Sequence, residues 1–132
     1  MATLDPAAPR RGRILLVEDD PAVRRSLQLL LAGHGYEVRA YPGAEGLAAD
    51  PEALRAECLV ADLVIPGVDG VALLQALRRA GWGGKAVLIS GNLTRASIER
   101  AAAEGFDAIL AKPFADSALL NSLGALLPAP AG

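Results

Sequence analysis

Short apolar runs alternate with longer amphipathic segments along most of the chain, and this alternation constrains the fold more than any other feature of the sequence. The apolar runs cover residues 14–17, 37–41, 58–61, 86–90 and 108–111. Nearly continuous apolar runs of this length are typical of strands that are buried on both faces of a parallel sheet. The sequence therefore favours an α/β fold built around such a sheet.

The segments between the apolar runs carry apolar residues at helical spacing. These residues are Val23, Leu27, Leu30 and Leu31, then Val71, Leu74 and Leu77, then Ile98, Ala101 and Ala102, and finally Leu119 and Leu123. The segment 43–57 is expected to form the weakest helix, because Asp50-Pro51 interrupts it. Helices that follow each strand would cover both faces of the predicted sheet.

The size and composition of the chain fit one domain. The sequence has 132 residues, of which 52% are hydrophobic, and this is enough for a single core. We expect the domain to span residues 13–127, between flexible tails at 1–12 and 128–132. The single cysteine, Cys58, lies in an apolar run, which excludes an internal disulfide and fits a cytoplasmic protein.

The distribution of charge argues against direct contact with nucleic acid or membranes. The formal net charge is −2, and the Lys and Arg residues are spread along the chain without forming a basic stripe. No apolar stretch is long enough to span a membrane, and no apolar segment follows the basic residues near the N-terminus. The sequence thus predicts a cytoplasmic protein whose partners are proteins.

Reactive polar residues follow four of the five apolar runs. They are Glu18, Asp19 and Asp20 after the first run, Asp62 after the third, Ser90 at the end of the fourth and Lys112 after the fifth. Ligands of open parallel sheets bind beyond the carboxyl ends of the strands, so we expect these residues to form one site. Asp20 has a separate role, because Asp20-Pro21 is typical of a helix start with its cap and first-turn proline.

The acids of this predicted site require a cation. Adjacent carboxylates repel one another unless a positive charge is shared between them. Mg²⁺ suits the cluster, because it takes oxygen ligands and commonly uses one or two protein carboxylates together with phosphate oxygens. Asp62 could then serve both as a metal ligand and as a nucleophile toward phosphorus, which forms an acyl phosphate. Lys112 and Ser90 would stabilise charge on the phosphoryl oxygens.

Four stretches of the sequence together resemble a known family. ILLVEDD, VADLVIPGVDG, VLISGN and ILAKPF occur in this order. At these separations they are similar to the receiver domain of bacterial two-component response regulators, and in particular to chemotaxis-regulator-like receivers. The resemblance runs from about Arg13 to Leu127. It implies a doubly wound (βα)5 flavodoxin-like three-layer sandwich with strand order 2-1-3-4-5.

The resemblance implies a Mg²⁺-dependent phosphoacceptor. Asp62 would accept a phosphoryl group from the phosphohistidine of a histidine kinase or a histidine phosphotransfer protein. Asp19 would bind Mg²⁺ directly and Glu18 largely through water, while Asp62 and the backbone carbonyl of Val64 would be further ligands. Such a domain is a signalling phosphoacceptor that assists its own phosphorylation and dephosphorylation, and is not classed as an enzyme.

The resemblance also implies a switch. The Ser90 hydroxyl would move toward the phosphoryl group, Lys112 would pair with that group, and the Lys112-Pro113 peptide would be cis. Ile109 stands where the family often has Tyr or Phe, so the expected readout depends on Ser90 and on loop rearrangement. Val64 and Asn92 occupy variable positions that tune the access of water to the acyl phosphate in this family.

The output of the switch would be a changed protein surface. The resemblance places this surface on the fourth helix, the fifth strand and the fifth helix, where it would meet a downstream protein target or a fused effector, or form a homodimer. No effector segment follows Leu127, and the chain starts at Met1 with a short tail. These features favour a stand-alone receiver over one excised from a longer regulator or a hybrid kinase.

Other ligand classes fit the sequence less well. Flavodoxin-type cofactor binding requires phosphate-binding donors in the loop that here holds Glu18, Asp19 and Asp20, and dinucleotide binding requires a GxGxxG segment after the first strand. A haloacid-dehalogenase-like phosphatase would have a second Asp at the position of Val64. The remaining alternative is a phosphorylation-independent, receiver-like interaction module, which Ile109 favours.

Overall fold

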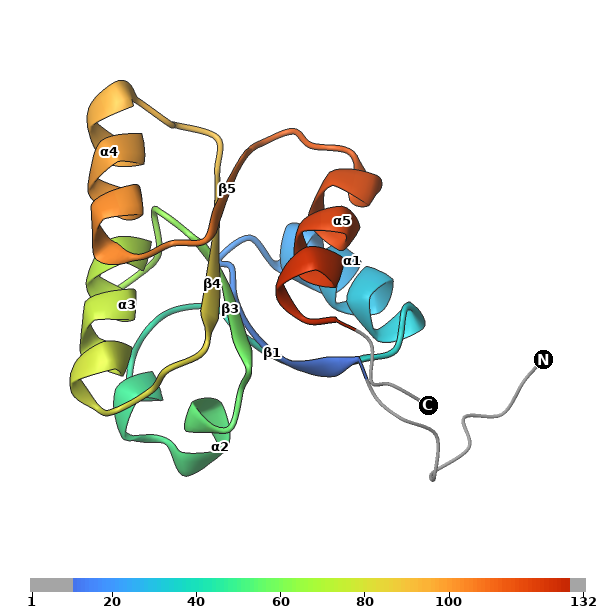
Figure 1. The fold of residues 1–132 in the computed structure, drawn as a ribbon, viewed down its shortest axis with the longest axis horizontal. Helices are drawn as coiled ribbons and strands as arrows, with labels where there is room; N and C mark the ends of the chain where they lie inside the picture. Colours follow the sequence, from blue (N-terminus) through green and yellow to red (C-terminus); the bar gives the residue numbers. More distant parts are fainter. Residues whose placement is uncertain (1–10, 129–132) are drawn as a thin grey trace.

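A parallel five-stranded sheet with the order β2-β1-β3-β4-β5 forms the centre of the structure, a computed structural model that describes residues 11–128 (Figure 1). The strands are β1 (Gly12–Val17), β2 (Tyr36–Tyr41), β3 (Cys58–Asp62), β4 (Lys85–Ser90) and β5 (Ala108–Ala111). The helices are α1 (Pro21–Gly33), the 3-10 helix η1 (Leu47–Ala49), α2 (Pro51–Leu54), α3 (Gly70–Arg79), α4 (Arg95–Glu104) and α5 (Asp116–Leu126). The predicted fold class and strand order are confirmed.

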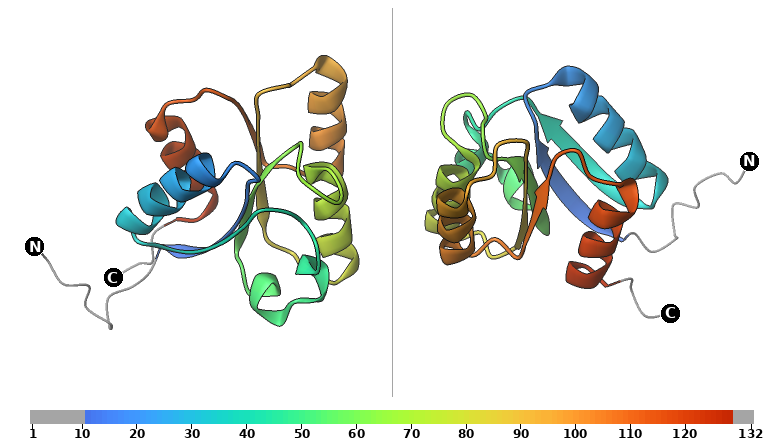
Figure 2. Two further views of the ribbon diagram at one scale, coloured as in Figure 1. Left: turned by 180° about the vertical axis from the view of Figure 1, so that it is seen from behind. Right: turned by 90° about the horizontal axis from the view of Figure 1, so that it is seen from above.

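The helices form two layers, one on each face of the sheet. Helices α1 and α5 cover one face, and α2, α3 and α4 cover the other (Figures 1 and 2). Successive side chains of a strand point to opposite faces, so Ile14 and Leu16 pack toward α1 and α5 while Leu15 and Val17 pack in the core beneath α3. Burial on both faces explains why these strands are continuous apolar runs.

The register of the sheet brings the carboxyl ends of four strands together. Val17 lies opposite Ala61, and Asp62 lies opposite Ile89. Ser90 lies opposite Ala111 in the neighbouring pair. The loops that leave β1, β3, β4 and β5 therefore begin side by side at one edge of the sheet.

Helix starts follow the capping residues in the sequence. The Asp20 carboxylate accepts hydrogen bonds from the backbone N–H groups of Ala22 and Val23 at 2.9 and 3.2 Å, which confirms its predicted role as the cap of α1. Asp69 caps α3 in the same way by accepting from Ala72 N–H at 2.8 Å. The segment 43–57 is the weakest helical region, as predicted, because Asp50 caps a new four-residue helix there.

Helix α4 packs one buried residue in the core and is also joined to α3 and its cap by polar side-chain pairs. Ala101 is buried, whereas Ile98 is 41% exposed although it shares the apolar spacing. Arg100 forms a two-pronged ion pair with Asp69, with distances of 2.6 and 3.2 Å between guanidinium nitrogens and carboxylate oxygens. Gln75 of α3 donates to the Glu104 carboxylate at 2.6 Å. Side-chain pairs thus join α4 to α3.

The sheet begins earlier in the sequence than the apolar pattern indicates. Gly12, which the sequence places in the N-terminal tail, is the first residue of β1 and lies opposite Tyr36. Arg11 N–H also donates to Gly35 O at 3.1 Å. Residues 1–10 and 129–132 of the predicted tails lie outside the described residues. None of the helices in the described part is long and apolar enough to cross a membrane.

Candidate functional site

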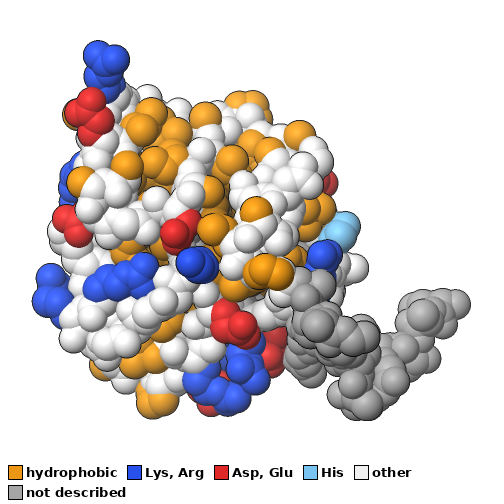
Figure 3. Space-filling model, in the orientation of Figure 1, with side chains coloured by type: hydrophobic (Ala, Val, Ile, Leu, Met, Phe, Trp, Pro, Cys, Tyr) orange, Lys and Arg blue, Asp and Glu red, His pale blue; other side chains and the backbone are white. Residues whose placement is uncertain are grey.

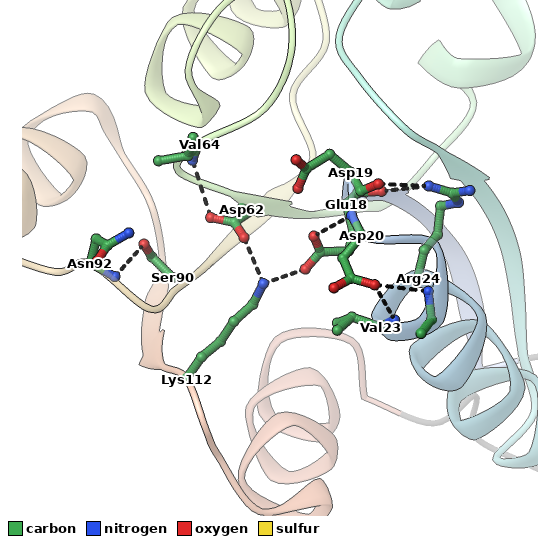
Figure 4. Close-up of polar contacts among 11 residues, drawn as sticks. Glu18, Asp19, Asp20, Val23, Arg24, Asp62, Val64, Ser90, Asn92 and Lys112 are labelled. Carbon is green, nitrogen blue, oxygen red and sulfur yellow. Dashed lines mark hydrogen bonds and ion pairs between the residues drawn. The ribbon is translucent and has the colours of Figure 1, made fainter.

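The candidate site lies where the loops leave β1, β3, β4 and β5 (Figure 4). Glu18 and Asp19 follow β1, Asp62 ends β3, Ser90 ends β4, and Lys112 follows β5. The parallel register therefore brings the reactive residues predicted from the sequence to one edge of the sheet.

Three carboxylates form the centre of the site. Ligand oxygens of Glu18, Asp19 and Asp62 all lie within 4.8 Å of one another. Glu18 and Asp62 are buried, and Asp19 is exposed. Carboxylates at this separation repel, and burial strengthens the repulsion. The cluster consequently requires neighbouring positive charge.

Lys112 supplies positive charge to the two buried carboxylates. Its Nζ lies 2.6 Å from Asp62 Oδ2 and also donates a hydrogen bond to Glu18 Oε1. Burial alone would lower the pKa of Lys112, but the hydrogen bonds to Asp62 and Glu18 outweigh it and raise that pKa above its usual value. Lys112 is therefore a cation in this site at neutral pH, and its one ammonium group faces a cluster of three acidic side chains.

The backbone around Asp62 holds its carboxylate in place. Asp62 Oδ1 accepts a hydrogen bond from Val64 N–H at 3.1 Å. Gly70 lies against the same strand end, since its N–H donates to Leu63 O at 2.8 Å and a Cβ at this position would overlap the carbonyl oxygen of Asp62. A glycine is required here for close packing rather than for an unusual backbone angle.

Ser90 approaches the site from β4. Ser90 is 1% exposed, and its Oγ accepts a hydrogen bond from Asn92 N–H at 3.1 Å. Its carbonyl accepts from Lys112 N–H at 2.8 Å, which fixes the start of the Lys112-Pro113 segment beside β4. The Lys112-Pro113 peptide is cis, as the family resemblance implies.

The loop between β1 and α1 is contacted by a residue that sequence reasoning missed. Arg24 Nη1 donates to Glu18 O at 3.0 Å and to Asp19 O at 3.4 Å. The sequence offers one sign of this contact. Arg24 stands one helical turn after the cap at Asp20, and a long basic side chain at that position can reach back over the loop. The contact itself depends on the side-chain conformation.

The donor set fits a hard divalent cation. Mg²⁺ prefers carboxylate and carbonyl oxygens, and the site offers three carboxylates on neighbouring loops. The Val64 carbonyl is on the loop directly after β3, and Val64 is 59% exposed. A cation at this cluster would reduce the repulsion that Lys112 leaves unbalanced.

The architecture agrees with comparisons to known proteins. Residues 14–124 match the family profile of the response regulator receiver domain. This chain belongs to the response regulator receiver family. It is a signalling domain of the kind found in two-component systems.

The relatives of this receiver are response regulators. Response regulator MprA of Mycobacterium tuberculosis is 39% identical over 121 residues, which cover 87% of this chain and 50% of MprA. DNA-binding response regulator MtrA of Mycolicibacterium smegmatis is 30% identical over 118 residues, which cover 89% of this chain and 51% of MtrA. The chain spans about half the length of the curated relatives it matches.

A solved receiver structure has the same architecture. The BeF3-activated N-terminal receiver domain of RstA from Klebsiella pneumoniae has a TM-score of 0.81 and 25% sequence identity to this receiver. The match covers 89% of this chain and 99% of the RstA chain.

Ile109 of this receiver is partly buried in β5 and packs against the core beneath α3.

Proposed function

We propose that this receiver accepts a phosphoryl group on Asp62 from the phosphohistidine of a histidine kinase or a histidine phosphotransfer protein, in a Mg²⁺-dependent reaction. The observation that carries the proposal is the position of the Asp62 carboxylate, which is 2.6 Å from Lys112 Nζ and within 4.8 Å of the Glu18 and Asp19 oxygens. These positions support the proposal, because a carboxylate nucleophile needs a cation and metal ligands within reach.

The chemistry is a transfer between nitrogen and oxygen. An Asp62 carboxylate oxygen forms the new bond to phosphorus, the P–N bond breaks, and its electron pair returns to the donor imidazole. Phosphoryl transfer depends mainly on positioning and on stabilisation of negative charge. Lys112 and the Ser90 hydroxyl provide that stabilisation from the protein. Mg²⁺ held by Asp19, Asp62, the Val64 carbonyl and, through water, Glu18 would neutralise further charge on the phosphoryl oxygens.

Phosphorylation of Asp62 would change a surface next to the site. Ser90 ends β4 just before α4, and Lys112 follows β5, so both residues border the surface formed by α4, β5 and α5. This part of the molecule carries many hydrophobic side chains (Figure 3), as is common where proteins bind one another. The polar attachment of α4 to α3 suits an element that shifts. The partner is a downstream protein target or a fused effector.

The receiver would assist its own phosphorylation and dephosphorylation through the same residues. The Asp62 side chain is 11% exposed, so little of it is open to water. Val64 donates its N–H to Asp62, and Asn92 donates its N–H to Ser90 Oγ, and these two residues would govern how water reaches the acyl phosphate. The receiver is therefore a phosphoacceptor whose own active groups set the lifetime of the signal.

Incubation with acetyl phosphate tests the proposal. The wild-type protein with Mg²⁺ should gain the mass of one phosphoryl group, whereas the Asp62→Asn variant and the wild type in excess EDTA should not. An unchanged mass with acetyl phosphate and with a panel of phosphorylated histidine kinases would count against the proposal.

A second candidate function is a receiver-like interaction module that works without phosphorylation. Ile109 favours it, because the family often has an aromatic residue there that takes part in the switch. Hydrogen exchange separates the two candidates. Beryllofluoride with Mg²⁺ should slow amide exchange in α4 and β5 of a phosphorylation-dependent switch, and it should leave exchange unchanged in a phosphorylation-independent module.

A further inference from the structure

Arg24 reaches back from α1 over the loop that carries the acidic residues (Figure 4). Its Nη1 donates to the backbone carbonyls of Glu18 and Asp19, at 3.0 and 3.4 Å. Its backbone N–H donates to Asp20 O at 2.8 Å. The Arg24 side chain therefore donates only to backbone carbonyls of the loop. These contacts hold the loop backbone and leave the carboxylates of Glu18 and Asp19 available to other partners.

The contacts of Arg24 restrict the orientation of two successive peptide groups. The Asp19–Asp20 peptide accepts from Arg24 through its carbonyl, and its N–H donates to Glu18 Oε2 at 3.1 Å. A peptide group is planar, so holding both ends fixes its plane. The preceding peptide is held through the carbonyl of Glu18. In Figure 4 the carbonyls face Arg24, while the side chains of Glu18 and Asp19 point to the opposite side, toward Asp62.

We propose that Arg24 is a positioning residue for the metal and phosphoryl site. By holding the carbonyls of Glu18 and Asp19, it keeps their carboxylates directed at Asp62 before any ligand binds. This inference rests on the proposed function, because it assumes that these carboxylates bind Mg²⁺. Residues that orient metal ligands typically change metal affinity by about 10-fold or more when they are replaced.

A guanidinium near a metal site also has an opposing effect. Its positive charge repels Mg²⁺ and would by itself weaken binding. The hydrogen bonds of Arg24 lie on the far side of the backbone from the carboxylates, and solvent near the exposed Asp19 screens the charge. The orienting effect should therefore be larger than the repulsion. Replacement by Gln separates the two effects, because it removes the charge and leaves a shorter amide donor.

Titration of Mg²⁺ into the full chain tests the role of Arg24 by calorimetry. The variants are Arg24→Ala, Arg24→Gln and Arg24→Lys, with Arg25→Ala as the matched control, since Arg25 is the next residue of α1 and is exposed. We expect Arg24→Ala to weaken Mg²⁺ binding about 10-fold. Arg24→Lys should restore part of the affinity, and Arg25→Ala should bind like the wild type.

Two further readouts separate positioning from a general loss of structure. Urea unfolding and the amide spectrum of residues outside the site should show that Arg24→Lys is folded, while the amide signals of Asp19 and Asp20 shift. An Mg²⁺ affinity of Arg24→Ala that equals or exceeds that of the wild type would overturn the inference and leave the proposed function intact. Absence of Mg²⁺ binding by the wild type would instead overturn the metal site itself, and with it both proposals.

Discussion

Lys112 Nζ donates a hydrogen bond to Asp62 Oδ2 at 2.6 Å, although the two residues are 50 positions apart in the sequence. The same ammonium group also binds the buried carboxylate of Glu18. Lys112 thus connects the end of β3 with the loops after β1 and β5, and its charge holds two buried carboxylates together.

Replacement of Lys112 by Met should destabilise the fold. Loss of one partner from a buried ion pair costs about 3–5 kcal/mol, and because the Lys112 side chain is 24% exposed we expect roughly 2 kcal/mol. Mg²⁺ should restore part of the loss by taking over the charge balance. Urea unfolding in EDTA and in Mg²⁺ measures both effects. The exposed Lys85, changed to Met, is the control, and equal stability of the two variants in EDTA would contradict this role for Lys112.

The ion pair between Asp69 and Arg100 should make the attachment of α4 dependent on pH. Burial alone would raise the pKa of Asp69, but hydrogen bonds from Arg100 and from Ala72 N–H lower it below the usual value. A carboxyl group whose pKa is lowered in the folded state stabilises the fold at pH values above its unfolded-state pKa of about 3.9. This stabilisation is lost as the pH falls through the lowered pKa of the folded state.

Amide exchange in α4 measures this dependence. At neutral pH, Arg100→Gln should exchange faster in α4 than the wild type, and Arg95→Gln, at the exposed start of the same helix, should not. The difference between Arg100→Gln and the wild type should shrink as Asp69 becomes protonated. A constant difference down to the lowest pH at which the protein stays folded would count against this ion pair as its cause.

A methyl group at Gly70 should directly disturb Asp62, the proposed phosphoacceptor. The Cβ of Gly70→Ala would overlap the carbonyl oxygen of Asp62 and lie 3.2 Å from a methyl carbon of Leu88, so β3 or α3 must move. Overpacking of this kind typically costs about 1–3 kcal/mol, and we expect phosphorylation by acetyl phosphate to slow as well.

The same substitution at Gly124 provides the control for Gly70→Ala. Gly124 lies within α5, and a methyl group added there would meet no heavy atom within 4 Å beyond its chain neighbours and the backbone of its own helix. Ala is a better helix former than Gly, so Gly124→Ala should stabilise the fold by up to about 1 kcal/mol. Thermal unfolding and the rate of phosphorylation by acetyl phosphate are measured for both variants. Equal stabilities and equal phosphorylation rates of Gly70→Ala and Gly124→Ala would rule out the predicted overlap at Gly70.

The sequence was sufficient to predict the architecture and which residues meet. Parallel strands that are buried on both faces appear in the sequence as apolar runs. Their carboxyl ends lie at one edge of the sheet, so residues that follow the runs, such as Asp62, Ser90 and Lys112, are expected to lie close together. The cap at Asp20 was predictable because it depends on neighbouring residues alone.

The details that depend on side-chain conformation were not predictable. Arg24 could have pointed into solvent, and nothing local indicates that it binds the carbonyls of the acidic loop. The exposure of Ile98 was also missed, because helical spacing defines an apolar face without showing how deeply the helix packs. The pairing of Arg100 with Asp69 joins residues 31 positions apart and depends on the placement of α4.

The central claim is that Asp62 itself carries the phosphoryl group, and chemical trapping tests it most directly. The protein is phosphorylated with acetyl phosphate and Mg²⁺, reduced with borohydride, digested and sequenced by mass spectrometry. Reduction converts an aspartyl phosphate to homoserine, so homoserine should be found at position 62 and should be absent when Mg²⁺ is omitted. Homoserine at position 19 instead, or an unmodified Asp62 in a protein that has gained a phosphoryl group, would contradict the account.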